Sequence, residues 1–243
     1  MCTVTFVPTP GGVFLTSNRD EKSVRAQALF PREYSFSTGR LLFPKDADAG
    51  GTWISIHENG NAIVFLNGGL HKHISQPPYR KSRGLILLDL LDSESPFRQF
   101  LAISLEGIEP FTAIIRDDNA LYECRWDGND KYTKTKDITQ SHIWSSVTLY
   151  TDDVIAKREQ WFRSWLSENP APSHEEILRF HQFTGDGDSW NDLTMNRGGE
   201  TFTVSITSLK LTADGASMTY LDLRAGKQET ADFSIEKYTG ALR

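Results

Sequence analysis

The sequence predicts an α+β fold in which helices pack on both faces of two stacked sheets. Strand-like segments fill the first part of the chain, helical periodicity dominates the middle, and strands return in the last quarter. The segment Ala62–Leu66 is apolar at every position, which is typical of a strand buried on both faces. No internal repeat or low-complexity linker interrupts residues 1–243, so we expect a single domain.

The first part of the chain is predicted to form two hairpins. Side chains alternate from residue 3 to residue 7, a Pro-Gly-Gly turn follows, and a second strand ends the hairpin of residues 2–17. This hairpin places the polar segment Ser17–Glu21 close to the start of the chain. The second hairpin spans residues 52–66, where an Asn-Gly turn joins two apolar runs. The polar stretch between the hairpins carries no strand prediction.

Helices and strands then follow in the middle and the last quarter. Helical spacing of apolar residues predicts helices at 82–91, 95–105, 152–167 and 173–181, the last of which opens with a capping box. Strands are predicted at 111–115, 121–126, 143–149, 202–209 and 218–223.

Composition excludes several classes of protein. The chain has 26 basic and 32 acidic residues, and a net charge of −6 argues against non-specific binding of nucleic acid. No apolar run approaches the roughly 20 residues that a membrane helix needs. The first residues lack the features of a signal peptide, which favours a cytoplasmic protein. Two cysteines, Cys2 and Cys124, are too few for a disulfide scaffold or a multi-cysteine zinc site.

Cys2 is the main candidate for a nucleophile. Removal of Met1 would leave Cys2 with a free α-amine, whose ordinary pKa of about 7.7–8.0 allows it to act as the base for its own thiol. The alternative is a small apolar residue in the first strand. Cys124 lies inside a predicted strand, where we expect a structural role.

Two polar segments are expected to accompany Cys2. The guanidinium of Arg19 would lower the pKa of a nearby thiol, and a neighbouring carboxylate such as Asp20 would hold the α-amine. The alternative for this segment is a solvated turn with weak surface ion pairs. Asn67 ends the most apolar strand, where it could donate to an oxyanion or simply form a turn with the glycines that follow.

Together these features resemble the NRDE family, whose eukaryotic members are called transport and Golgi organisation protein 2. The resemblance rests on the strings MCTVTF, SNRDE, GGTWISI and GNAIVFLNG in about the first 70 residues, and a weaker similarity appears at residues 202–223. The family is in turn similar to N-terminal nucleophile hydrolases of the bile-salt hydrolase and penicillin V acylase type. Those enzymes cleave non-peptide amide bonds from a four-layer αββα fold.

The resemblance implies the same αββα sandwich for this chain and assigns the candidate residues to roles. It implies Cys2 as nucleophile and base, Arg19 and Asp20 beside it, and Asn67 as a donor to the oxyanion. Ser146 stands where the family often has an asparagine that completes the oxyanion hole. Arg197 is the nearest candidate for an arginine expected late in the chain.

We therefore predict a cysteine hydrolase that acts on a small non-peptide amide or acyl substrate and needs no cofactor or metal. The alternative is a non-catalytic family member that binds a lipid-like or haem-like ligand, with a role in trafficking or ligand handling. His71 and His73 could ligate a metal or haem, although this spacing is more typical of exposed polar residues. The acidic segment that starts at residue 186 lacks the glycine at the sixth position and the glutamate at the twelfth position of a calcium loop.

Overall fold

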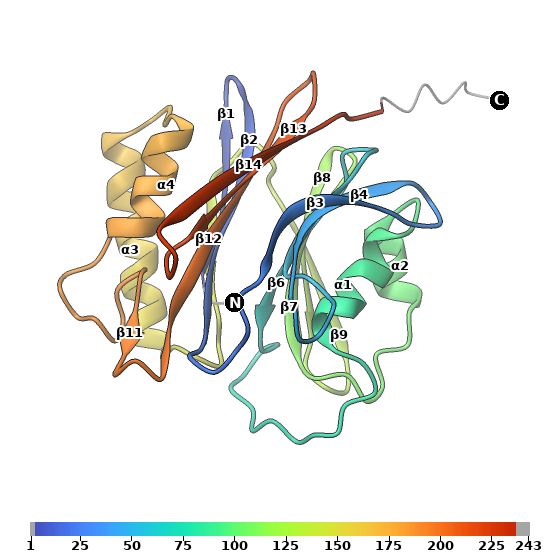
Figure 1. Ribbon diagram of the computed structural model, residues 1–243, viewed down its shortest axis with the longest axis horizontal. Helices are drawn as coiled ribbons and strands as arrows, with labels where there is room; N and C mark the ends of the chain where they lie inside the picture. The colour runs from blue at the N-terminus through green and yellow to red at the C-terminus, as the bar shows by residue number, and fades with distance from the viewer. Residues whose placement is uncertain (1–2, 237–243) are drawn as a thin grey trace.

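Two antiparallel sheets lie face to face in the computed structural model, which describes residues 3–236 (Figure 1). Sheet 1 contains β1 (Thr3–Thr9), β2 (Gly12–Lys22), β10 (His142–Ser145), β11 (Asn196–Arg197), β12 (Thr201–Leu211), β13 (Ala216–Asp222) and β14 (Lys227–Phe233). Its strand order is β10–β1–β2–β12–β13–β14, and β11 pairs with β12. The first hairpin of the chain therefore lies beside strands from its last quarter.

Sheet 2 is a meander whose strands follow each other in chain order. It contains β3 (Leu29–Ser35), β4 (Arg40–Lys45), β5 (Ile54–His57), β6 (Ala62–Asn67), β7 (Phe111–Asp117), β8 (Ala120–Trp126) and β9 (Lys131–Lys136). All of its described pairs are antiparallel.

Two pairs of helices form the outer layers. Helices α1 (Arg83–Leu91) and α2 (Pro96–Ala102) cover sheet 2, and α3 (Asp152–Glu168) and α4 (His174–Phe183) cover sheet 1 (Figure 1). The order of layers is helices, sheet 1, sheet 2, helices. The predicted four-layer αββα sandwich is confirmed.

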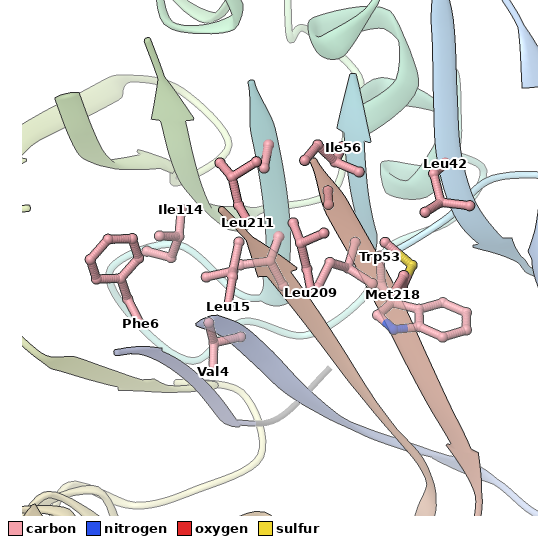
Figure 2. Close-up of a cluster of buried hydrophobic side chains, with 14 of the residues drawn as sticks. Val4, Phe6, Leu15, Leu42, Trp53, Ile56, Ile114, Leu209, Leu211 and Met218 are labelled. Carbon is pink, nitrogen blue, oxygen red and sulfur yellow. The ribbon is translucent and has the colours of Figure 1, made fainter. Parts of the chain in front are cut away.

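A continuous apolar core fills the space between the sheets. Val4, Leu15 and Leu209 of sheet 1 face Ile56 and other side chains of sheet 2 (Figure 2). Strand β6 is buried on both faces, as its apolar sequence predicts, because alternate residues face the other sheet and helix α1. This double burial fixes the position of the strand that ends at Asn67.

The outer layers have their own apolar clusters. Phe162 of α3 and Phe180 of α4 pack on Val7 and Phe14 of the first hairpin. Trp161 and Trp165 of α3 pack against the same cluster and are partly buried. No helix that the structure describes is long and apolar enough to cross a membrane.

The structure contains five strands that the sequence pattern does not predict: β3, β4, β9, β11 and β14. Strands β3, β9 and β14 lie at sheet edges and are largely exposed, so they lack the apolar alternation that marks a half-buried strand. Strand β4 is buried, but its apolar run is three residues long and ends at Pro44. The strand predicted at 143–149 ends at Ser145, and the helix predicted at 95–105 ends at Ala102.

Candidate functional site

A pocket of about 470 Å³ lies at the end of β2, between the two sheets and the start of α1. Its ionisable lining residues are Arg19, Glu21, Arg25, Asp46, Tyr79, Lys81, Arg83 and Glu109. Trp53, Phe65 and Leu66 supply an apolar part of the wall, and Asn67 lies beside them. The pocket therefore combines charged and apolar lining residues.

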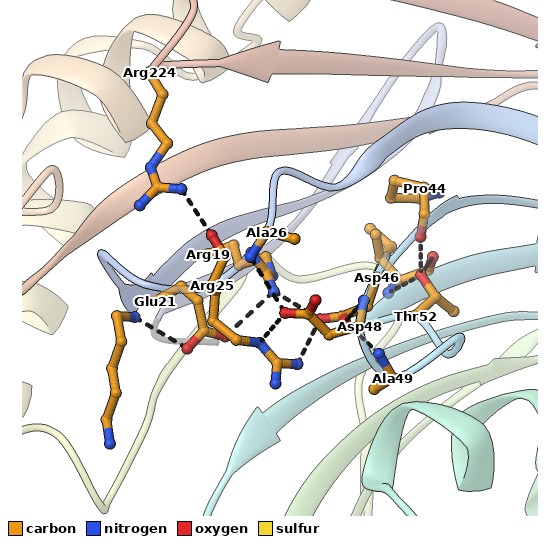
Figure 3. Close-up of polar contacts among 12 residues, drawn as sticks. Arg19, Glu21, Arg25, Ala26, Pro44, Asp46, Asp48, Ala49, Thr52 and Arg224 are labelled. Carbon is orange, nitrogen blue, oxygen red and sulfur yellow. Dashed lines mark hydrogen bonds and ion pairs between the residues drawn. The ribbon is translucent and has the colours of Figure 1, made fainter.

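Arg19 is held on three sides in this pocket. Its Nη2 donates to Asp46 Oδ2 at 2.8 Å and to Glu21 Oε2 at 3.2 Å (Figure 3). The guanidinium carbon also lies 4.7 Å from the ring centroid of Trp53, a cation–π contact. Because the side chain is 6% exposed, its positive charge stays at a fixed position.

Asp46 binds two arginines and the backbone of its own loop. It accepts from Arg25 Nη2 at 2.8 Å and from the N–H groups of Asp48 and Ala49 at 3.0 and 2.8 Å. Burial opposes ionisation of Asp46, but the Ala49 N–H and the guanidinium of Arg25 outweigh it and lower the pKa of this carboxyl. Asp46 is therefore ionised at neutral pH and links Arg19 to Arg25.

Strand alternation divides the Asn-Arg-Asp-Glu segment between the two faces of sheet 1. Arg19 and Glu21 line the pocket, whereas Asn18 and Asp20 face the helices. The Asp20 carboxylate accepts from the Tyr150 hydroxyl and from Thr203 Oγ1, each at 2.6 Å. Of the two residues predicted beside Cys2, Arg19 lines the pocket and Asp20 does not.

Glu21 lines the pocket although it is not among the residues predicted for the site. The available signal was the period of two in the strand, because Glu21 and Arg19 are two residues apart and share a face. Arg25 and Asp46 come from other loops, so no local pattern joins them to the segment.

Asn67 lies at the end of β6 and lines the pocket together with Arg19. Its carbonyl accepts a hydrogen bond of 2.8 Å from the hydroxyl of Ser146, which also lies 2.9 Å from Thr148 Oγ1. Gly68 follows with φ +87°, and a Cβ atom there would collide with Val147 and Thr148. The strand end is thus fixed against the loop after β10.

Arg197 does not line the pocket. Its guanidinium donates to the carbonyls of Leu149 and Trp190 at 3.0 and 3.2 Å.

A second arginine, Arg158 of α3, lies beneath the start of β1 and is fully buried. It donates to Thr3 Oγ1 and to the carbonyls of Asn191 and Asp192, and its guanidinium stacks 3.7 Å from the Tyr150 ring centroid. No local sequence pattern marks Arg158 as a partner of the first strand.

Cys2 lies outside the described residues, as does everything before Thr3. Thr3 itself is paired with Asn18 of β2 on one side and Ser145 of β10 on the other. The hairpin therefore brings the start of β1 next to Arg19, as predicted. Cys124 is buried under α1 and α2 in sheet 2, and burial raises the pKa of its thiol, which agrees with a structural role.

The wall at the start of α1 contains Arg83 of the helix and Lys81 of the loop before it. Arg83 donates to the Pro110 carbonyl at 3.2 Å and lies 3.0 Å from Glu109 Oε2. Burial lowers the pKa of the Arg83 guanidinium in spite of the nearby Glu109. Within residues 3–236 no cluster of three or more His, Cys, Asp or Glu side chains is arranged to hold a metal ion.

Comparison with protein families identifies the chain. The family model described as Transport and Golgi organisation 2 matches residues 1–201. The chain belongs to this family. The resemblance read from the Asn-Arg-Asp-Glu segment and its neighbours is thereby confirmed. A comparison with the sequences of curated proteins gives no match.

Solved structures place this member of the Transport and Golgi organisation 2 family among N-terminal nucleophile hydrolase folds. A variant of conjugated bile acid hydrolase from Clostridium perfringens superposes with a TM-score of 0.63 at 13% identity, covering 100% of this chain and 95% of that one. The Caenorhabditis elegans ortholog of N-acylethanolamine-hydrolyzing acid amidase gives 0.61 at 9% identity, covering 96% and 100%. At these identities the likeness establishes the shared fold.

Proposed function

We propose that this protein is a hydrolase that cleaves a small non-peptide amide or related acyl compound, with Cys2 as its nucleophile. The main support is that Arg19 and Asn67, chosen from sequence, line one pocket, and that Thr3 pairs with Asn18, the residue before Arg19. Cys2 directly precedes Thr3 in the chain. The bile acid hydrolase of the comparison carries, by its description, a cysteine-to-alanine change at its own position 2.

The proposed reaction has two halves. The Cys2 sulfur attacks the substrate carbonyl carbon, the S–C bond forms, the C–N bond breaks, and the thiol proton reaches the leaving amine through the α-amine of Cys2. Water then attacks the thioester, the S–C bond breaks, and the α-amine returns a water proton to the sulfur. The α-amine is available for both halves only after Met1 has been removed.

The pocket residues have separate tasks in this proposal. Arg19, fixed by Asp46 and Trp53, keeps a positive charge near the first strand, which favours the thiolate. Glu21, which shares the pocket with Arg19, supplies the carboxylate that holds the α-amine. The amide of Asn67 donates to the oxyanion, and Ser146 fixes the strand end that carries it.

In this proposal Asp20 has a structural role. Its hydrogen bonds to Tyr150 and Thr203 join β2 to β12 and to the segment before α3. It therefore positions the strand that carries Arg19 and Glu21 without touching the substrate.

The non-catalytic alternative, a binder of a lipid-like or haem-like ligand, receives less support from the pocket. Seven of its 17 lining residues are arginine, lysine, aspartate or glutamate, and an apolar ligand would remove these charges from water. The alternative predicts that Cys2→Ala keeps the function, whereas the hydrolase proposal predicts that it abolishes turnover.

The first prediction is acylation of Cys2. Protein incubated with a panel of amide and lactone probes should gain the mass of one acyl group, and peptide mapping should locate it at Cys2. Cys124→Ala should label like the wild type, because Cys124 is buried in sheet 2. Complete retention of Met1 in natively expressed protein, or labelling that persists in Cys2→Ala, would exclude the proposal.

The second prediction separates the two carboxylates of the segment. Glu21→Gln should lower kcat/KM by about 10²-fold or more, because the α-amine that acts as the base loses the carboxylate that holds it, and leave the unfolding midpoint nearly unchanged. Asp20→Asn should instead lower the free energy of unfolding by about 1–3 kcal/mol, because two buried hydroxyl contacts lose their ionised acceptor. Equal effects of both changes on turnover and on stability would contradict this division.

A further inference from the structure

We infer that the pocket selects a compact substrate that carries an anionic group, a carboxylate or a phosphate, and binds this group with Lys81 and Arg83. The inference rests on the proposed function for its reaction, but the binding of the anion does not depend on catalysis. The charged residues on the two walls of the pocket differ in how completely they are paired with opposite charges.

The carboxylates on the β2 side of the pocket are each paired with two arginines. Asp46 lies 2.8 Å from both Arg19 and Arg25, and Glu21 lies 3.2 Å from Arg19 and 3.8 Å from Arg25 (Figure 3). The two positive and two negative charges balance, so this wall as a whole carries no net charge.

The wall formed by the start of α1 has an excess of positive charge toward the pocket. Lys81 and Arg83 line it, and Glu109 is the carboxylate among its lining residues. Lys81 pairs with Asp89, which does not line the pocket, and this pair is about one third exposed and therefore weak. An anion in the pocket can thus compete for Lys81.

Arg83 has unused capacity for an anion. Its Nη1 donates to the Pro110 carbonyl and its Nη2 lies near Glu109, whereas a guanidinium has five N–H donors. Burial lowers the pKa of this guanidinium, and the charges of Glu109 and Glu21 offset the effect only in part. A carboxylate or phosphate in the pocket would complete the compensation.

The backbone of the same wall supports this assignment. Ser82, Arg83 and Gly84 form the start of α1 and line the pocket, so the positive end of the helix dipole faces it. Gly84 packs directly on Thr52, because a Cβ atom at Gly84 would lie 2.8 Å from the Thr52 carbonyl oxygen. This close contact fixes the helix end against the wall that holds Trp53.

The same charges limit the size of the apolar part of the substrate. Trp53, Phe65 and Leu66 can cover a short acyl group, but a longer chain would have to displace water from the ion pairs on either side. A substrate with an anionic group at Arg83 and a short acyl group near Asn67 would contact both the charged wall and the apolar wall of the pocket.

The test compares three ligands with one short acyl group: N-butyrylglycine, its neutral amide N-butyrylglycinamide, and N-butyrylaminomethylphosphonate. Binding is measured by calorimetry in the Cys2→Ala protein, where no turnover can occur. Both anions should bind about tenfold or more tightly than the neutral amide, a difference typical of one charge-assisted contact. The ratio of the affinities for the carboxylate ligand and the phosphonate ligand shows which anion the site prefers.

Variants assign the preference to the proposed wall. In the Cys2→Ala background, Arg83→Gln and Lys81→Gln should each reduce the preference for the anions to about threefold or less, and Arg98→Gln on the exposed surface of α2 should keep it. Lys81 is partly exposed, so its variant tests the site even if Arg83→Gln lowers stability. Equal affinity for all three ligands, or a preference that survives both substitutions, would overturn the inference.

The outcome is separable from that of the proposed function. Anion-selective binding without hydrolysis in the wild type would exclude the enzyme and keep the binding site. Hydrolysis of neutral and anionic amides at equal rates and equal affinities would keep the enzyme and exclude the anion site.

Discussion

His181 of α4 lies beneath the first hairpin with both ring nitrogens engaged. Its Nδ1 is 2.5 Å from Asn18 Oδ1, and its Nε2 is 2.7 Å from Thr5 Oγ1. The Asn18 amide nitrogen donates to the carbonyls of His181 and Leu193, so its oxygen must accept from the ring. Nδ1 therefore carries the proton, and Nε2 accepts from Thr5. Burial, with the charge of Arg158, lowers the pKa of His181 to about 3.

This neutral histidine makes the stability of the protein depend on pH. Below about pH 6.5 the unfolded chain binds a proton at His181 that the folded protein excludes, so stability falls as the pH decreases. The loss attributable to His181 should approach about 1.4 kcal/mol per pH unit between pH 6 and pH 4. Urea unfolding of the wild type and of His181→Gln at several pH values measures it as the difference between the two curves. Parallel curves would show that His181 is protonated in the folded protein.

At the same scale, the sequence predicts part of the candidate site. Arg19 and Asn67 can be selected because each comes at or shortly after the end of an apolar run with a strand pattern. Asp46 and Lys81 cannot, because they reach the pocket through loops whose positions depend on contacts between distant segments. The orientation of Asp20 follows from the alternation in β2, but only once β2 is known to extend to Lys22.

Among the elements, those with strong local signals are predicted and those that depend on neighbours are not. The hairpin of β5 and β6 has an Asn-Gly turn, and α4 has a capping box. Strands β9 and β14 carry alternating charged and polar residues with little apolar content, and they form because β8 and β13 offer unpaired edges. These two strands form because of the neighbouring strand in the sheet, and the local sequence pattern carries no information about that neighbour.

The contact between the loop before β5 and helix α1 depends on two glycines. A Cβ atom at Gly51 would lie 2.4 Å from the backbone carbon of Gly84. Gly51→Ala should therefore lower the free energy of unfolding by about 1–3 kcal/mol, the usual cost of overpacking, and should weaken ligand binding at the α1 wall. Chemical denaturation with calorimetry measures both.

The matched control is Gly11→Ala, because a Cβ atom at Gly11 meets nothing within 4 Å. Its unfolding free energy should stay within about 0.5 kcal/mol of the wild type. A Gly51 variant as stable as this control would show that the loop and the helix can separate without loss.

In the whole molecule, both sheets share one central core. Val4 and Leu209 of sheet 1 belong to the same buried cluster as Ile54 and Ile114 of sheet 2. Each sheet therefore needs the other to bury the apolar side chains of its inner face. The sequence predicts a single domain from its lack of linkers, and this shared core gives the physical reason to expect one.

We therefore expect cooperative unfolding of the whole chain. Denaturant transitions followed by far-UV circular dichroism and by tryptophan fluorescence should coincide, and slowly exchanging amides of β6 and β12 should report the same opening free energy. Two separated transitions, or exchange in β12 with a clearly lower free energy than in β6, would indicate that the sheets unfold independently.

The pairing of β2 with β12 has a consequence for biosynthesis. The first hairpin leaves the ribosome while its partner strand, about 180 residues further along the chain, is still untranslated. Until Leu211 has emerged, the nascent chain exposes the unpaired edge of β2 and the apolar side chain of Leu15. The free edge can form backbone hydrogen bonds with a strand of another chain, and the exposed apolar side chain favours aggregation. We expect the growing polypeptide to depend on chaperones for most of its translation.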